Sequence, residues 1–471
     1  MIALSLAEIA EVVGGQTHDI PDPSVQVTGP VVRDSREVEP GSLFVAFVGE
    51  RVDGHDYAAA VVEAGAAAVL ASRPVGVPAI VVDDVQTALG ALARHVVRKL
   101  GTTLVALTGS AGKTSTKDLI AQVLRGKAPT VWTPGSFNNE IGLPLTALSA
   151  TEETRFLVLE MGARGIGHIR YLTELTPPKV GLVLNVGTAH IGEFGGREQI
   201  AQAKGELVEA LPAASEGGAA ILNADDPLVR AMASRTKAKV ILFGESDEAD
   251  VRAENVALTD AGQPVFRLHT PSGASDVTMR LYGEHHVSNA LAAAAVAHEL
   301  GMSAEEIATA LSEAGSLSRW RMEVTERPDG VTVVNDAYNA NPESMRAALR
   351  ALAAMGKGRR TWAVLGKMAE LGDEALAEHD AVGRLAVRLN VGKLVAVGGR
   401  EASWLQLGAY NEGSWGEESV HVSDAQAAID LLRSELRPGD VVLVKASRSV
   451  GLESVAQALL ETGAEGEVAA R

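Results

Sequence analysis

The chain of 471 residues contains no cysteine and no long run of apolar residues. The lack of cysteine excludes disulfides, thiolate metal sites and cysteine nucleophiles, and it fits a reducing compartment. No apolar stretch approaches the roughly 18 residues that a membrane span needs. The N-terminal segment lacks a basic region and carries Glu8 and Glu11, so it predicts an amphipathic helix rather than a signal peptide. We therefore expect a cytoplasmic protein.

Basic residues are also scarce, since 42 Lys and Arg stand against 60 Asp and Glu and the formal net charge is −18. A sequence-independent nucleic-acid binder needs surplus basic side chains to displace counterions from phosphates. An anionic membrane surface attracts basic proteins for a similar reason. We therefore expect neither nucleic acid nor membrane as a partner. Because aromatic residues make up only 4% and hydrophobic residues 46%, the cores should consist mostly of Ala, Val and Leu.

The length predicts about three domains at roughly 100–200 residues each. Short, almost wholly apolar runs alternate with helical patterns, which is typical of parallel sheets covered on both faces. Residues 250–282 instead alternate apolar and polar residues and predict a small antiparallel excursion. The predicted fold class is α/β, with a mixed N-terminal domain, a central P-loop-type parallel sheet and a C-terminal Rossmann-like domain. The predicted domains are 1–98, 99–317 and 318–471, and the predicted strands lie at 43–49, 66–71, 79–84, 104–107, 156–160, 181–186, 219–222, 239–243, 331–336, 361–366, 393–398 and 440–447.

A predicted strand, a glycine-rich turn and a helix follow one another over residues 104–124. Such a turn directs backbone N–H groups toward a polyphosphate, and the helix N-terminus adds positive potential. Lys113 would reach the terminal phosphates and the Thr114 hydroxyl would ligate Mg²⁺. The strict P-loop pattern has glycine six residues before this lysine, where Leu107 stands, so the loop is a shortened one. The alternative is a helix that merely begins with Gly-Lys-Thr. The predicted ATP- or GTP-binding residues are Gly109, Ser110, Ala111, Gly112, Lys113, Thr114 and Ser115.

Polar side chains come near the ends of the next predicted strands. Glu160 ends one strand, and Asn185 and His190 follow another. Open α/β sheets bind ligands at the carboxyl ends of their strands, so Glu160 is a candidate metal ligand, although a helix cap or a solvated carboxylate is the plain alternative. A lone histidine is more often structural, because Mg²⁺ prefers oxygen. Lys204, inside the predicted helix 197–211, by itself indicates only an exposed helical lysine.

The short loop and the motifs after it resemble the Mur ligases, which are ATP-dependent amide-bond ligases of peptidoglycan precursor synthesis. The resemblance covers essentially the whole chain and implies an N-terminal domain that binds a UDP substrate, a central ATP-binding domain and a C-terminal ligase domain. The motifs occur in the family's order: TGSAGKTS at 108–115, NVGTAHIGEFGG at 185–196, AKGEL at 203–207, NADDP at 223–227, GEHHVSNALAA at 283–293, SRWRMEV at 318–324 and NDAYNANPESM at 335–345.

The resemblance also implies chemistry at named residues. ATP would phosphorylate a carboxylate to an acyl phosphate, and an amine would then attack the carbonyl carbon, with two Mg²⁺ ions nearby. Thr114, Glu160 and His190 would hold metal. The catalytic residues would be Lys113, His190 and Lys204. The matching lysine in the family is carbamylated, which implies that Lys204 becomes an anionic oxygen ligand.

Further residues match the family's nucleotide contacts. Asn289 would face adenine, while His286 stands where the family usually has asparagine. Arg321 resembles the arginine that reaches the phosphates, and Arg319 is a nearby competitor. Asp336, Tyr338 and Asn339 would contact the ribose and base. The pair Asn341–Pro342 indicates an ordinary helix N-cap followed by proline at the first helical position. Contacts from two domains to one ATP imply hinged closure.

The N-terminal stretch 31–57 resembles the later-acting members of the family, where it binds the UDP of the substrate. Asp34, Ser35 and Arg36 are the candidates, with a polar turn as the alternative. The chain lacks the DNPR motif of the ligases that add a diamino acid. Segments 133–146 and 363–379 are similar to members that add D-alanyl-D-alanine. Asn138 and Asn139 would orient substrate, and 366–370 would form part of the dipeptide end.

These resemblances imply a monomeric enzyme whose substrates are UDP-N-acetylmuramoyl-tripeptide and D-alanyl-D-alanine. Two other readings stay open within the amide ligases: a diamino-acid-adding Mur ligase and a cyanophycin- or folate-type relative. A third reading, from a different class, is a P-loop protein that binds nucleotide without ligase chemistry.

Overall fold

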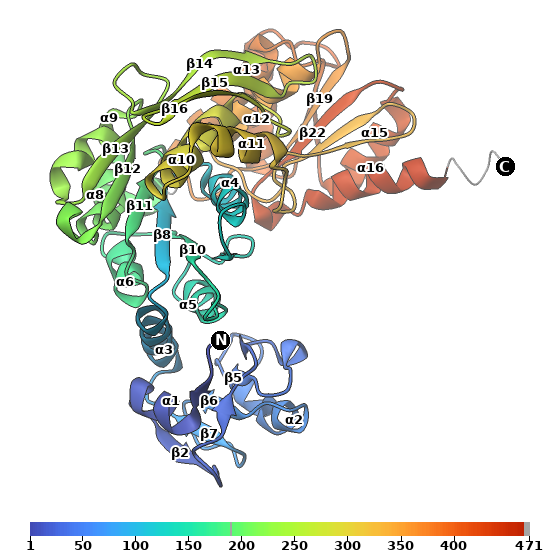
Figure 1. Cartoon of the computed structure of the whole chain (residues 1–471). Coiled ribbons are helices and arrows are strands. Elements are labelled where there is room, and N and C mark those ends of the chain that lie inside the picture. The colour runs from blue at the N-terminus through green and yellow to red at the C-terminus, as the bar shows by residue number, and fades with distance from the viewer. Residues whose placement is uncertain (189–190, 466–471) are drawn as a thin grey trace.

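The computed structural model describes residues 1–188 and 191–465. Three large sheets follow one another along the chain, and each has helices packed against it (Figure 1). The N-terminal sheet lies apart from the other two in this view, and one long helix leads from it into the rest of the molecule. This arrangement confirms the predicted α/β fold class.

The N-terminal part contains a five-stranded sheet in the order β2-β7-β6-β5-β4, beside a two-stranded pair of β1 and β3. Only β2 runs antiparallel to its neighbour in the larger sheet, so the sheet is mixed, as predicted. The amphipathic helix expected at the N-terminus is α1, which begins after the capping hydroxyl of Ser5. The elements are β1 (Leu4–Ser5), α1 (Leu6–Val13), β2 (Gln16–His18), β3 (Gln26–Val27), β4 (Val31–Val32), β5 (Leu43–Val45), α2 (Ala58–Glu63), β6 (Ala68–Ala71), β7 (Ala79–Val81) and α3 (Val85–Leu100).

The central sheet has nine strands in the order β16-β15-β14-β13-β12-β11-β8-β10-β9. The strands from β9 to β14 pair in parallel, and their apolar sequences reflect helices on both faces. The predicted antiparallel excursion is β14, β15 and β16, and it continues the same sheet because β14 pairs with β13. The strands are β8 (Thr103–Thr108), β9 (Thr130–Trp132), β10 (Phe156–Glu160), β11 (Val180–Val183), β12 (Ala219–Asn223), β13 (Lys239–Gly244), β14 (Val251–Leu258), β15 (Pro264–Thr270) and β16 (Gly273–Thr278).

The alanine-rich helix α10 is buried along most of its length against α4, β13 and β14. Small side chains allow this close approach of a helix to a sheet, in line with the Ala-, Val- and Leu-rich cores predicted from composition. The helices of this part are α4 (Lys113–Arg125), α5 (Gly142–Leu148), α6 (His168–Leu175), α7 (Ile191–Phe194), α8 (Arg197–Glu209), α9 (Pro227–Arg230), α10 (His285–Glu299) and α11 (Ala304–Glu313).

The C-terminal sheet has the order β17-β18-β22-β19-β20-β21, and all its pairs are parallel except the β17–β18 edge. Separate apolar clusters fill its two faces, as the Rossmann-like prediction requires. The edge strands β17 and β21 are not among the predicted strands, because their partly exposed residues do not form apolar runs. The elements are β17 (Glu323–Glu326), β18 (Thr332–Asn335), α12 (Pro342–Met355), β19 (Thr361–Leu365), α13 (Ala375–Arg388), β20 (Lys393–Val397), α14 (Arg400–Asn411), β21 (Ser419–Val422), α15 (Ala425–Glu435), β22 (Val441–Lys445) and α16 (Glu453–Glu465).

Short 3₁₀ helices complete the chain. They lie at Ser35–Glu37, Gly54–Tyr57, Ala214–Glu216, Ala231–Arg235, Gly372–Glu374 and Arg448–Val450. The predicted domain boundaries stay predictions; α3 runs without a break through the first of them, at residue 98. Within 1–188 and 191–465, no helix is both long and apolar enough to cross a membrane.

Candidate active site

A cavity of 740 Å³ lies where all three parts of the chain meet. Its lining includes residues that follow the carboxyl ends of β8 and β10 in the central sheet and of β18, β19 and β22 in the C-terminal sheet. Arg33 from the N-terminal part also lines it. Because both sheets are mainly parallel, their ligand-binding edges can face one another across this space.

The glycine-rich loop forms one wall of the cavity. Asn185 shapes it, because its Oδ1 atom accepts hydrogen bonds from the backbone N–H groups of Ser110 and Ala111, both at 2.9 Å. Gly112 caps α4 with a positive φ of 79°, and a Cβ atom there would lie 2.6 Å from Oδ1 of Asn289. The cavity is lined by five of the seven predicted loop residues: Ser110, Ala111, Gly112, Lys113 and Thr114.

Lys113 is the cation of this loop. Its Nζ atom donates to the carbonyl oxygen of Gly109 at 2.7 Å. Burial lowers the pKa of the Lys113 amine, while the carboxylate of Glu160 opposes that shift and Arg321 reinforces it. Lys113 and Arg321 thus place positive charge beside the loop, where the phosphates of a nucleotide would lie.

A hydroxyl and a carboxylate meet beside the loop. Thr114 Oγ1 donates to Oε2 of Glu160 at 2.9 Å, and Asn138 Nδ2 donates to Oε1 of the same carboxylate at 2.7 Å. Oxygen ligands of this kind suit Mg²⁺, which takes one or two carboxylates together with water and substrate phosphates. Among the described residues, no cluster of three or more His, Cys, Asp or Glu could hold a metal by itself.

Lys117 supports this group from inside the protein. Its side chain is fully buried, and Nζ donates to the carbonyl oxygens of Thr133 and Gly135 at 2.7 and 2.8 Å. Thr133 Oγ1 in turn accepts from the backbone N–H of Glu160 at 3.1 Å. Lys117 thus fixes the start of the loop that carries Asn138. No pattern in the sequence singles Lys117 out.

The structure brings Arg321 to the phosphate loop from the C-terminal part. Its Nη2 atom donates to Thr114 Oγ1 at 3.2 Å and to Ser136 Oγ at 3.3 Å, while Tyr338 stacks on its guanidinium at 4.2 Å. Arg319, the competitor, is not among the residues that line the cavity.

Asp336 forms its contacts within the C-terminal part of the chain. Its Oδ1 accepts from the backbone N–H of Met322 at 3.1 Å, and its Oδ2 pairs with Nζ of the buried Lys445 at 2.5 Å. It therefore holds the segment that presents Arg321. Tyr338 and Asn339 line the cavity, whereas Asp336 does not.

Asn341 combines two roles. It caps α12, as predicted, because its Oδ1 accepts from the backbone N–H of Ser344. Its Nδ2 atom also donates to the carbonyl oxygen of Ser110 at 3.3 Å, which ties the C-terminal part to the phosphate loop.

Lys204 is buried at 5% exposure and lines the cavity, contrary to the plain reading of an exposed helical lysine. It makes no hydrogen bond or ion pair with any residue in the described part of the chain. Burial lowers the pKa of its amine well below the usual value, and the positive charge of Lys113 lowers it further. The helix that carries it is anchored by Glu206, which accepts from the backbone N–H groups of Gly167 and Arg170. His190 lies outside the described residues.

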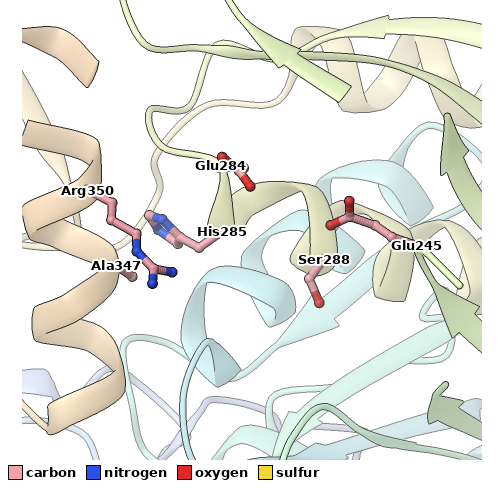
Figure 2. A pocket seen from close by; sticks show the side chains of 6 residues that line it. All are labelled: Glu245, Glu284, His285, Ser288, Ala347 and Arg350. Atoms are coloured by element: carbon pink, nitrogen blue, oxygen red, sulfur yellow. The ribbon is translucent and has the colours of Figure 1, made fainter. Parts of the chain in front are cut away.

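Asn289 lies behind the loop rather than in the cavity, and its Oδ1 accepts from Thr116 Oγ1 at 3.1 Å. His286 is buried beside it, with its Nδ1 atom 3.4 Å from Nδ2 of Asn289. A second hollow of 160 Å³ opens between the start of α10 and α12 (Figure 2). Its lining residues are Glu245, Glu284, His285, Ser288, Ala347 and Arg350.

Some of the residues predicted to bind substrate line the cavity and others do not. Asp34, Ser35 and Arg36 form a polar turn outside the cavity, where Asp34 caps the turn and pairs with Arg36, and the neighbouring Arg33 lines the cavity instead. Asn138 and Asn139 both line it. In the segment 366–370, residues 369 and 370 line it.

Several lining residues had no sequence signal beyond their closeness to a recognised motif. Their identity depends on which loops converge in space. They are Arg33, Ser136, Phe137, Arg164, His168 and Arg448.

Comparison with known proteins agrees with this arrangement along the chain. Residues 31–97 match the model of the Mur ligase family catalytic domain, and 107–297 match the Mur ligase middle domain. Residues 320–448 match the Mur ligase, glutamate ligase domain. This chain belongs to the Mur ligase family.

Similar members of the Mur ligase family extend over the same length. A UDP-N-acetylmuramoyl-tripeptide–D-alanyl-D-alanine ligase from Mycobacterium bovis is 51% identical, over 99% of this chain and 100% of the relative. The enzyme of that name from Escherichia coli is 36% identical, over 98% and 100%. A crystal structure of MurF from Acinetobacter baumannii superposes with a TM-score of 0.87 at 33% identity, over 98% and 99% of the two chains. A MurF ligase from Thermotoga maritima in complex with ADP gives a TM-score of 0.79 at 30% identity, over 93% and 99%.

Proposed function

We propose that this Mur ligase joins D-alanyl-D-alanine to UDP-N-acetylmuramoyl-tripeptide and consumes ATP in peptidoglycan precursor synthesis. The observation that carries the proposal is 51% identity over 99% of the chain to a ligase of that name. The cavity shared by three parts of the chain supports it, because the reaction must bring two substrates and ATP together. We further expect a monomer that works in the cytoplasm.

The first chemical step builds charge on phosphate oxygens. The tripeptide carboxylate attacks the γ-phosphorus of ATP, the bond to the bridging oxygen breaks, and ADP leaves an acyl phosphate behind. The loop N–H groups, Lys113 and Arg321 are placed to stabilise that charge before it develops. In this proposal Arg321 moves from its contacts with Thr114 and Ser136 to the phosphate chain.

Thr114 and Glu160 fit a bound Mg²⁺, because a hydroxyl and a carboxylate oxygen lie 2.9 Å apart beside the phosphate loop. The ion would neutralise negative charge on the phosphate oxygens. Asn138 holds the other oxygen of the same carboxylate and so fixes its orientation. His190 is the third metal ligand in this proposal.

We propose that Lys204 is carbamylated. Forming a carbamate requires a neutral amine. Lys204 is buried and has no acidic partner within 1–188 and 191–465, and burial gives its amine the low pKa that supplies the neutral form. Carbon dioxide adds to the amine nitrogen, one proton leaves, and the product is an anion with two oxygen ligands. An anion there would offset the positive charge of Lys113 and could serve the second Mg²⁺.

The smaller hollow suits the base of ATP in this proposal. Glu245 and Glu284 line it and supply carboxylate acceptors for an exocyclic amine. Burial and the neighbouring carboxylates of Asp225 and Glu284 raise the pKa of Glu245. His285 lines the same hollow and interacts electrostatically with Asp336, which connects it to the proposed ribose contacts.

The amide-forming step needs an uncharged amine near the acyl carbon and little water. The amine nitrogen attacks the carbonyl carbon, phosphate leaves and the nitrogen loses a proton. Walls contributed by all three parts would keep water away from the acyl phosphate.

The proposal is tested by ADP release from the purified protein with UDP-N-acetylmuramoyl-tripeptide and Mg²⁺. We expect release that depends on D-alanyl-D-alanine and an amide product of matching mass. Release that depends instead on a free diamino acid or on glutamate would assign another amide ligase. Nucleotide binding with no amine-dependent release would indicate a non-catalytic protein.

A further inference from the structure

The proposed reaction places three kinds of anion in one cavity: the phosphates of ATP, the anionic UDP substrate and the free carboxylate of the incoming dipeptide. Lys113 serves the loop side, and Arg33 and Arg164 also line the cavity. The C-terminal part contributes only two arginines to the described lining. One of them, Arg321, already reaches the phosphate loop. The other, Arg448, has no assigned role.

Arg448 is held in a defined position although its side chain is half-exposed. It follows β22, at the start of the short helix Arg448–Val450. Its Nη1 atom pairs with the carboxylate of Glu453, and its guanidinium lies 4.4 Å from the ring centroid of Trp320. Trp320 has a positive φ of 59°, which is rare for a bulky residue and persists only where the surrounding structure holds it. An exposed arginine fixed on both sides is preorganised rather than freely mobile.

The unused donors of Arg448 form a fork. Its Nε and Nη2 groups donate to no residue in the described part of the chain. In Arg360, Nε and Nη2 donate to the two carboxylate oxygens of Asp440 at 3.0 and 2.8 Å. This pair shows how the same two donors of an arginine bind a carboxylate. A carboxylate is therefore the ligand that this edge fits best.

The loops beside Arg448 are tied together by Ser447. Ser447 Oγ accepts from the backbone N–H of Ala369 at 2.9 Å and lies 3.3 Å from the carbonyl oxygen of Ala340. It thereby joins the loops that follow β18, β19 and β22. Ala369, Glu370 and Ser449 line the same wall as Arg448.

We propose that Arg448 binds the free carboxylate of the incoming D-alanyl-D-alanine, an inference that rests on the proposed function. In an extended dipeptide the attacking amine and the carboxylate lie about 7 Å apart, at roughly 3.5 Å per residue. A fixed cation at the far end of the site would bind the carboxylate of a dipeptide. The carboxylate of a single amino acid lies beside its amine and would not reach this cation. Arg448 thus contributes to selection of a dipeptide.

The test compares D-alanyl-D-alanine with its C-terminal amide, which has no negative charge. The variants are Arg448→Gln and the double variant Arg448→Gln/Glu453→Gln, which leaves no unpaired carboxylate at the site. In both we expect KM for the dipeptide to rise by about 10–100-fold, as the loss of a charge-assisted hydrogen bond predicts. KM for ATP and for the UDP substrate should stay within about twofold, a split that general misfolding would not produce.

The decisive readout is discrimination between acid and amide. The unmodified enzyme should prefer the acid by at least about tenfold, and the double variant should use both equally well. Arg448→Lys, which keeps the charge without the fork, should be intermediate. Arg400→Gln is the matched control, because Arg400 also stacks on a tryptophan, at 5.0 Å, but lies outside the cavity lining.

A double variant that prefers the acid as strongly as the unmodified enzyme would overturn the proposal for Arg448. Failure of the proposed function has a different signature, because the unmodified enzyme would then release no ADP in response to D-alanyl-D-alanine.

Discussion

Lys113 and Lys204 show how two lysines in one cavity can differ in chemistry. Lys113 belongs to a loop whose N–H groups, glycine conformation and helix N-terminus all favour an anion. Lys204 is buried, lacks an acidic partner among the described residues and lies close enough to Lys113 to be affected by its charge. The first lysine suits a charged role, while the second favours a neutral amine open to modification.

Lys113→Ala should lower kcat/KM by about a thousandfold or more, because a preorganised cation at the transferred phosphate is lost. The melting temperature should not fall, since within the described residues the variant loses a single hydrogen bond, from Nζ to the Gly109 carbonyl. Lys127→Ala is the matched control, because Lys127 also donates to a backbone carbonyl, that of Gly301, but is exposed. Near-normal turnover in Lys113→Ala would contradict the phosphate-loop assignment.

Lys204→Ala should lose most activity, and Lys204→Arg should not restore it because arginine keeps a positive charge. Acetate should recover part of the rate in the alanine variant by supplying a carboxylate. Carbon-13 NMR of protein equilibrated with labelled bicarbonate should show a carbamate signal that disappears in both variants. An exposed lysine such as Lys179 provides the control. Full activity of Lys204→Arg would rule out the carbamate.

His285 should make stability depend on pH. Burial lowers its pKa to about 4, from an unfolded value near 6.5. The unfolded chain therefore binds more protons between these values, so this contribution is present above about pH 6.5 and is lost as the pH falls toward 4. The shift corresponds to a loss on the order of 3 kcal/mol, at about 1.4 kcal/mol per pKa unit.

Urea unfolding of the nucleotide-free protein at several pH values measures this slope. We expect His285→Gln to flatten it and His421→Gln, at an exposed position, to leave it unchanged. An identical slope in His285→Gln would show that other groups set the acid sensitivity.

At the scale of elements, the join between β8 and α4 combines a strained backbone with a close contact. Gly112 has a left-handed φ, and Asn289 on α10 fills the space where a Cβ atom would lie. Nearby, Lys117 on α4 fixes the segment after β9, which carries the partner of Glu160. The phosphate loop and the carboxylate are thus supported by α10, by α4 and by the segment after β9, in addition to their own strands.

Gly112→Ala should lower the free energy of unfolding by about 1–3 kcal/mol, because the left-handed conformation and the contact with Asn289 both oppose a methyl group. It should also weaken ATP binding at least tenfold. Gly101→Ala separates the two causes, since Gly101 has a φ of 62° with no atom within 4 Å of the added Cβ. Chemical denaturation and calorimetric titration of both variants provide the measurements. Equal ATP affinity in the two variants would show that the contact with Asn289 is unimportant.

For the whole molecule, contacts between the central and C-terminal parts hold the cavity together. Glu343 at the start of α12 accepts hydrogen bonds from the backbone N–H and Oγ1 of Thr188, both at 2.9 Å. Asn341 and Arg321 add bonds to Ser110 and Thr114. These contacts lie beside the proposed ATP site, so domain closure and nucleotide binding should be coupled.

Glu343→Ala should favour a more open arrangement and raise KM for ATP several-fold, while kcat at saturating ATP changes less. Small-angle scattering without nucleotide should show a larger radius of gyration, which ATP reduces. Glu417→Ala, at an exposed position of the same domain, is the control. An unchanged radius and KM would show that this contact does not govern closure.

The sequence determined much of this protein, because local chemistry is enough for some features. Apolar runs and amphipathic spacing predicted the parallel sheets, and the strand–loop–helix pattern around Lys113 predicted the nucleotide loop. The Asn341–Pro342 cap also followed from residues adjacent in sequence. The order of the motifs along the chain was sufficient to recognise the family.

Tertiary structure alone decided which side chains share one cavity. The turn at Asp34–Arg36 was recognised, yet Arg33 is the residue that lines the cavity. The local pattern around Lys204 indicates a surface lysine and only the family resemblance gave it a role, whereas the fold buries it. Lys117 and Arg448 gave no signal in the sequence. Burial, ion pairing and convergence depend on segments that are hundreds of residues apart. No periodicity within a single helix or strand encodes those distances.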